Sequence, residues 1–319
     1  MTTAYAPYLG PAAGVAASLL WTTTALCFTA AAKRIGAAAV NSTRIILAIA
    51  WLGLTHRLLN GIWIPHASGT QIVLLAISGL LGLTLGDLAL FKAYVYIGPR
   101  LAMLVMTTAP IFTVLLGWLV LGEALTGPMW IGMVLTVGGV AWVVLERPAG
   151  EGGAGHSHRA AGLLLALLAT IGQAGGSLLS KSGMGHGWLP EDQLMPPQTA
   201  ALVRMFFAGI FTTPTIVWLA ARGRAERGGA KAGAEGGLRR TGYIMTFCGS
   251  LVGPYLGMWM SLEAFHRSPL GVAQTLCSLT PVFILPFVIV VQKERVTVRA
   301  ALGALVAVLG TAILFLPGR

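Results

Sequence analysis

Long apolar runs alternate with short polar segments along almost the whole chain. The apolar runs fall at about 11–32, 37–58, 70–91, 101–121, 128–146, 161–181, 198–220, 241–262, 269–291 and 299–316. Most are close to the roughly 20 residues that an α-helix needs to cross a bilayer. The Gly-rich polar segment 147–160 leaves five runs on each side. The pattern predicts ten transmembrane helices in two five-helix units, 11–146 and 161–316, with a linker between them.

The two predicted units contain a similar sequence motif. "PIFTVLLGWLVLGE" runs from Pro110 to Glu123, and "PVFILPFVIVVQKE" runs from Pro281 to Glu294, 171 positions later. The same offset joins further identical residues: Gly82 and Gly253, Gly86 and Gly257, Phe112 and Phe283, Thr126 and Thr297, Gly132 and Gly303, and Gly139 and Gly310. A chance match would not keep these residues in register, so the pattern indicates an internal duplication.

The number of helices per unit decides how the two copies lie in the membrane. Five is odd, so a second copy enters the bilayer from the opposite side. Two five-helix repeats of inverted topology are typical of alternating-access transporters. We therefore expect an all-α polytopic membrane protein of this kind.

Composition agrees with a membrane protein. The chain is 56% hydrophobic and 10% charged, whereas a soluble domain carries about 25% charged residues. The net charge of +11 arises from residues that flank the apolar runs, where anionic lipids and topology explain it. Membrane lipids are therefore expected partners, and nucleic acid is not.

The basic residues also predict an orientation. Fifteen of the 21 lysines and arginines lie in the segments that follow runs one, three, five, seven and nine. Positively charged loops stay in the cytoplasm. Both termini are therefore predicted to lie outside.

Charged residues inside the apolar runs are candidates for function because burying them in hydrocarbon is costly. Asp87 has two interpretations, a substrate or proton site and a structural hydrogen bond to a neighbouring helix. Arg44 and Arg204 lie early in the second run of each unit. This symmetry favours a structural role, such as holding a helix end or reaching the membrane surface, over direct substrate contact. Glu123 and Glu294 are likewise expected to be structural charges.

Two prolines predict kinks in the fourth and ninth helices. Pro110 and Pro281 each remove a backbone hydrogen bond and free a carbonyl group about one turn earlier. Thr107, Thr108 and Ser278 lie beside these positions. We expect a cavity between the two units, lined by helices one, three, four, six, eight and nine. Its other polar and aromatic candidates are Trp21, Tyr94, Gln173, Tyr255, Trp259 and Gln274.

The sequence carries no convincing enzyme signature. The segment "LTLGD" ending at Asp87 is similar to the Gly-x-Gly-Asp of intramembrane aspartyl proteases, but Thr84 replaces the first glycine and no second aspartate lies inside a run. His156 and His158 fall in the linker, and Cys27, Cys248 and Cys277 lack metal-ligand spacing. We expect no catalytic residues, no cofactor and no metal.

The duplicated pattern A…P-x-F-x(10)-E-x-x-T-x(5)-G-x(6)-G spans Ala102–Gly139 and Ala273–Gly310. Together with Arg44 and Arg204, it resembles the EamA family of the drug/metabolite transporter superfamily. The resemblance implies an inner-membrane carrier for small metabolites or drugs, often an exporter, with a cavity between the halves. The expected partner is a small-molecule substrate, and the chain is expected to act as a monomer or homodimer. Transport coupled to protons through Asp87 and facilitated diffusion both fit the sequence. The alternative from another class is a lipid-handling protein, either a flippase or a membrane-embedded transferase.

Overall fold

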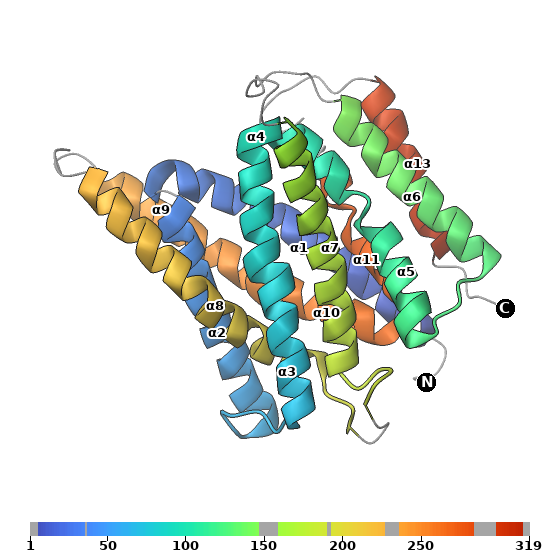
Figure 1. Ribbon diagram of the computed structural model, residues 1–319, viewed down its shortest axis with the longest axis horizontal. Coiled ribbons are helices and arrows are strands. Elements are labelled where there is room, and N and C mark those ends of the chain that lie inside the picture. The colour runs from blue at the N-terminus through green and yellow to red at the C-terminus, as the bar shows by residue number, and fades with distance from the viewer. Residues whose placement is uncertain are drawn as a thin grey trace.

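All regular secondary structure in the described part of the chain is helical. The structure is a computed structural model that describes residues 6–35, 37–146, 159–189, 193–226, 236–283 and 298–314. The helices (Figure 1) are α1 (Ala6–Ile35), α2 (Ala37–Asn60), α3 (Gly69–Ser78), the π-helix η1 (Gly79–Leu85), α4 (Gly86–Met106), α5 (Ala109–Leu121), α6 (Gly127–Glu146), α7 (Arg159–Gly183), α8 (Pro197–Glu226), α9 (Gly236–Ser250), the π-helix η4 (Leu251–Gly257), α10 (Met258–Arg267), α11 (Leu270–Cys277) and α13 (Val298–Leu314).

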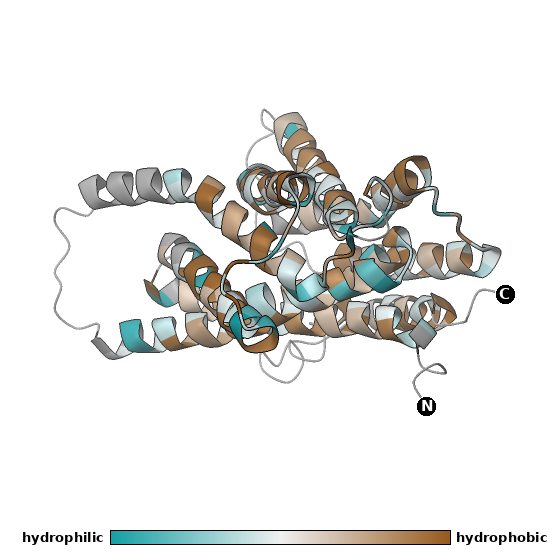
Figure 2. Cartoon of the chain, turned by 90° about the horizontal axis from the view of Figure 1, so that it is seen from below, coloured by the Kyte–Doolittle hydropathy of each residue, from teal (hydrophilic) through white to brown (hydrophobic). Residues whose placement is uncertain are grey.

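Apolar residues predominate along most of these helices (Figure 2), and many large apolar side chains are exposed, as expected for helices surrounded by lipid. Five helical stretches of the described residues are long and apolar enough to cross a membrane: Pro7–Ala32, Gly69–Ile97, Ala102–Leu121, Gly127–Leu145 and Arg159–Gly183. Shorter apolar helices cover Leu270–Phe283 and Ala301–Leu314. The prediction of an all-α membrane fold is confirmed, and the total of ten spans remains a prediction.

The third helix of each repeat contains a π-helical turn at an equivalent place. The π-turn of the first repeat covers residues 79–85, and that of the second covers residues 251–257. The two turns are therefore within one residue of the positions that the repeat offset of 171 predicts. Two of the paired glycines, Gly82 and Gly253, lie in these turns. A π-turn widens a helix locally and is frequent at functional sites.

The fourth helix of each repeat breaks at equivalent places, Thr107–Thr108 and Ser278–Leu279. Pro110 is the second residue of α5, and Pro281 is the second residue after the other break. Both prolines lie inside an apolar stretch, Ala102–Leu121 or Leu270–Phe283, that is interrupted just before them. Each proline occupies the first turn of a new helical segment, where its missing N–H costs nothing.

The last helices of the two repeats show that the repeats are inverted. α6 and α13 lie side by side at one edge of the molecule (Figure 1). A Cβ added at Gly132 would lie 2.9 Å from the Gly310 carbonyl oxygen, and one added at Gly139 would lie 2.6 Å from that of Gly303. Advancing along α6 therefore means going backwards along α13. Since Gly132 and Gly303 are repeat equivalents, equivalent helices run in opposite directions.

The two repeats interlock around a shared interior. α1 packs against α9, η4 and α10 of the second repeat, and α7 packs in the equivalent way against α3, η1 and α4 of the first. α2 and α8, the second helices, also pack against each other in opposite directions, with Gln198 donating to the Leu52 carbonyl oxygen and Gly209 near Ile45. The space between the repeats is thus bordered by α1 and α7, α2 and α8, and the two π-turns.

Candidate functional site

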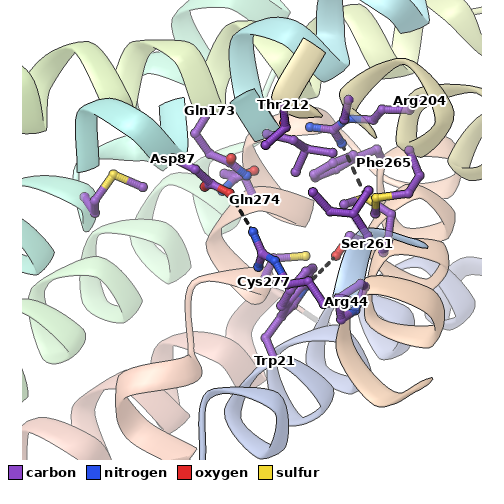
Figure 3. A pocket seen from close by; sticks show the side chains of 17 residues that line it. Trp21, Arg44, Asp87, Gln173, Arg204, Thr212, Ser261, Phe265, Gln274 and Cys277 are labelled. Atoms are coloured by element: carbon purple, nitrogen blue, oxygen red, sulfur yellow. Dashed lines mark hydrogen bonds and ion pairs between the residues drawn. The ribbon is translucent and has the colours of Figure 1, made fainter. Parts of the chain in front are cut away.

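A cavity of about 270 Å³ lies between the two repeats (Figure 3). Its polar lining consists of Arg44, Asp87, Gln173, Arg204, Thr212, Ser261 and Gln274. Its apolar and aromatic lining includes Trp21, Ile45, Leu83, Met106, Met205, Ala208, Pro254, Met258, Phe265 and Cys277. These residues come from helices of both repeats, so the cavity is a site between them of the kind that small-molecule sites occupy in helical proteins.

Asp87 and Arg44 form an ion pair on the cavity wall. The Arg44 Nη2 atom lies 3.2 Å from Asp87 Oδ2, and Arg44 Nε donates to Asn41 Oδ1 at 2.8 Å. The Arg44 guanidinium also lies 5.8 Å from the centre of the Phe28 ring. A third of the Asp87 side chain and a fifth of the Arg44 side chain are exposed. This exposed surface faces the cavity, so both charges are accessible from it.

Arg204 differs from Arg44 although the two are repeat equivalents. It is only 2% exposed, and its Nε atom has no hydrogen-bond partner among the described residues. Its Nη1 atom lies 3.6 Å from the sulfur of Met258. The guanidinium fits against two glycines, because a Cβ at Gly82 or Gly176 would lie 2.8 or 3.3 Å from Nη2. Figure 3 shows this guanidinium directed into the cavity.

The remaining polar groups of the wall are mostly held by hydrogen bonds. Ser177 donates to Gln274 Oε1 at 3.0 Å, and the Trp21 indole N–H donates to Ser261 at 3.3 Å. Thr212 shares a hydrogen bond of 3.1 Å with Thr84. These bonds fix the shape of the wall and leave the arginines and Asp87 as its charged groups.

A second cluster of charges closes one end of the molecule. Lys181 Nζ donates to Glu123 Oε1 and to the Ser268 carbonyl oxygen, and the Leu270 backbone N–H donates to Glu123 Oε2 at 2.7 Å. We call Glu123, Lys181, Ser268 and Leu270 the Glu123 cluster. It joins the end of α5, the end of α7 and the start of α11. The Lys181 side chain is 7% exposed, so the charges of this cluster are shielded from solvent.

Two histidines lie next to the Glu123 cluster. His186 Nε2 and His266 Nδ1 are 2.9 Å apart, and their rings make an edge contact. Partial burial, together with the positive charge of Lys181 and the neighbouring His266, lowers the pKa of His186 to about 4. His186 is therefore neutral at pH 7.

Four of the residues predicted to line the cavity do so: Trp21, Asp87, Gln173 and Gln274. Arg44 and Arg204 also line it, which corrects the expectation that they hold helix ends or reach the surface. The expected set of helices was also incomplete, because α2 and α8 contribute both arginines.

The hydroxyl residues that were predicted to line the cavity instead form hydrogen bonds with the backbone of their own helices. The hydroxyls of Thr107 and Thr108 donate to the Leu104 and Val105 carbonyl oxygens, which also accept the backbone N–H groups of the same two threonines. Ser278 donates to the Gln274 carbonyl oxygen in the equivalent place. These three residues are not among those that line the cavity.

Two aromatic residues that were predicted to line the cavity also lie outside its lining. Tyr255 shares a hydrogen bond of 2.7 Å with Thr55, and Trp259 packs beside Tyr255 with ring centres 6.3 Å apart. Neither is among the cavity-lining residues. The side chain of Tyr94 and the whole of Glu294 lie outside the described part of the structure.

The repeat offset could have found several lining residues that the sequence analysis missed. Adding 171 to Leu83, Asp87 and Met106 gives Pro254, Met258 and Cys277, and all six line the cavity. Thr212, Ser261 and Phe265 have no such sequence signal. Met258 is the repeat partner of Asp87, and the two residues line the same cavity.

Two inverted helical repeats around a charged cavity, with an apolar exterior, define a membrane transporter architecture. The family model of the EamA-like transporter family matches residues 9–145 and 160–316, one copy for each repeat. The chain therefore belongs to this family and is a multi-pass membrane transporter of the drug/metabolite transporter superfamily. Members of the family are transporters rather than enzymes.

The fold is also found among solved structures. Twenty-six solved chains match this one. One of them, titled only "Crystal structure of protein", has a TM-score of 0.73 and 18% sequence identity over 96% of this chain and 98% of the other. No curated protein matches the chain. The structural likeness therefore establishes the fold and carries no information about the substrate.

Proposed function

We propose that the protein carries a small organic solute across the bacterial inner membrane by alternating access, as an exporter. The observation that carries this proposal is the charged cavity between two inverted repeats. Inverted repeats can exchange conformations, because each half can adopt the arrangement of the other. The cavity then faces first one side of the membrane and then the other.

The partial exposure of Arg44 and Asp87 supports a cavity that opens at the Arg44 end. Arg44 lies two turns from the start of α2, and Arg204 lies two turns from the start of α8. Because α2 and α8 run in opposite directions, the two arginines lie towards opposite ends of the cavity. Arg44 and Asp87 are accessible, whereas Arg204, on the side of the Glu123 cluster, is buried. With the orientation expected from the basic residues, the Glu123 cluster closes the outer side and the open end faces the cytoplasm.

Asp87 is the proposed coupling residue for protons. It faces Arg44 and Arg204 across the cavity, with Cys277 as the other titratable group of the lining. Protonation would release Arg44 from its ion pair and change the charge of the cavity by one unit. Transport by the wild-type protein should therefore depend on pH, whereas transport by Asp87→Asn should not.

The test is solute counterflow in proteoliposomes with labelled metabolites, measured between pH 5.5 and 8. Accumulation that requires the protein and disappears when the trapped solute is omitted supports carrier function. Absence of counterflow with every metabolite of a broad panel would reject it. If Asp87→Asn kept the wild-type pH dependence, Asp87 would not be the coupling residue.

One observation bears on the lipid-handling alternative. An apolar groove of about 320 Å³ lies between α2 and α8, and Ile45 lines both this groove and the cavity. Apart from Thr213, the groove is lined by apolar residues and glycine. It offers no polar site for a lipid headgroup, so transport of a soluble molecule is better supported.

A further inference from the structure

The cavity contains a buried cation with no carboxylate in ion-pair contact, because the acid whose charge acts on it, Asp87, is paired with Arg44. Arg204 is 2% exposed and forms no ion pair with any residue that the structure describes. Its Nε atom is unpartnered, and its Nη1 atom faces only the neutral sulfur of Met258. A guanidinium cannot lose its charge by deprotonation in a protein. Burial without a negative partner is costly, so this position calls for an anion.

The surroundings of Arg204 hold it in place. Gly82 in η1 and Gly176 in α7 leave the space that the guanidinium fills. The equivalent space in the other repeat is closed, because Gly253 lies against Thr24 and the Phe28 ring lies beside Arg44. Arg204 is thus a fixed cation, whereas Arg44 is the one that pairs with Asp87.

The charges of the cavity indicate what kind of anion fits. The lining has two arginines and one carboxylate, and the carboxylate is already paired with Arg44. One positive charge is left, and it matches a monoanion. A carboxylate accepts two parallel hydrogen bonds from a guanidinium. A phosphate ester, with close to two negative charges at pH 7, would leave an excess of negative charge beside Asp87.

We propose that Arg204 binds the carboxylate group of an organic monoanion, whose apolar part lies against Trp21 and Phe265. This inference rests on the proposed carrier function, since it names the chemistry of the transported solute. The amides of Gln173 and Gln274 lie on the same wall and complete the polar part of the site. The cavity thus selects its solutes by charge at one end and by apolar contact at the other.

The first test uses the wild-type protein in detergent and needs no substitution. Its thermal stability is measured with several tens of aliphatic and aromatic monocarboxylates, each paired with its neutral primary amide, and with phenyl phosphate. We expect stabilising carboxylates to bind at least tenfold more tightly than their amides, and phenyl phosphate to bind weakly. Equal binding of the amides, preference for phenyl phosphate, or no stabilising carboxylate would overturn the proposal.

Three variants assign the effect to Arg204. Arg204→Gln should lose at least tenfold in affinity for the best carboxylate and bind it no better than the amide. Arg204→Lys should be intermediate, because it keeps the charge but not the fork of donors. Arg57→Gln, at the exposed end of α2, is the matched control and should leave the affinity unchanged. Full carboxylate preference in a folded Arg204→Gln protein would contradict the assignment.

Counterflow measurements with the same compounds test the Arg204 site and the carrier function independently of each other. Carboxylate binding without counterflow would reject the carrier function and leave the Arg204 site in place. Counterflow of neutral or cationic solutes, with no preference for carboxylates, would support the carrier function and reject the Arg204 site.

Discussion

The contact between α6 and α13 predicts a large difference between two neighbouring glycines. A Cβ at Gly139 would lie 2.4 Å from the Ala307 nitrogen and 2.6 Å from the Gly303 carbonyl oxygen, and both are backbone atoms. Ordinary contact begins at 3.4 Å, so Gly139→Ala must push the helices apart by roughly 1 Å. Overpacking of this kind costs about 1–3 kcal/mol.

Gly138 is the matched control for this change. A Cβ at Gly138 meets nothing within 4 Å. Both substitutions gain the same helix propensity of about 1 kcal/mol, so the difference between the variants isolates the contact. We expect Gly139→Ala to melt roughly 2–5 °C below Gly138→Ala in the same detergent. Equal melting temperatures for the two purified variants would refute the antiparallel contact and the inverted arrangement inferred from it.

Other predictions concern the closed end of the molecule. Glu123→Gln leaves the buried Lys181 without its negative partner, and such a loss costs about 3–5 kcal/mol in buried pairs. We therefore expect faster hydrogen–deuterium exchange of the backbone amides of Leu270 and its neighbours. Unchanged exchange rates would contradict this prediction. The lowered pKa of His186, about 4, means that the unfolded chain takes up the proton first as the pH falls below about 6.5. The melting temperature of the wild-type protein should therefore fall from pH 6.5 towards pH 4, and it should fall less in His186→Gln. The same pH dependence of the melting temperature in both proteins would exclude His186 as a cause.

Hydrophobic pattern and internal repetition were enough to predict the helical membrane fold and its duplication. Both depend on composition and spacing, which the chain displays directly. The π-turns at Gly79–Leu85 and Leu251–Gly257 were not predicted, because they depend on how α7 and α1 pack against these segments. Pro110 and Pro281 did predict kinks in the fourth and ninth helices, but not that each helix breaks shortly before its proline.

The candidate site was predicted in part. Asp87 stood out because an acid inside an apolar run needs a partner, but its partner Arg44 is 43 residues away and belongs to another helix. A structural role was favoured for the arginines because they occupy equivalent positions in the two units, and this symmetry does not tell a helix-end position from a position in a cavity between the units. The hydroxyls near the prolines donate to backbone carbonyls of the preceding turn, and sequence alone could not tell this use from a role in the cavity.

The most direct test of alternating access is the accessibility of the cavity from each side of the membrane. Gln173 faces the cavity and is partly exposed, so Gln173→Cys, in a chain with Cys27, Cys248 and Cys277 changed to alanine, reports on it. A membrane-impermeant thiol reagent is added to either side of oriented vesicles. We predict fast labelling from the Arg44 end, and labelling from the Glu123 end that increases with transported solute or with Glu123→Gln. Labelling from one side alone under every condition would contradict alternating access.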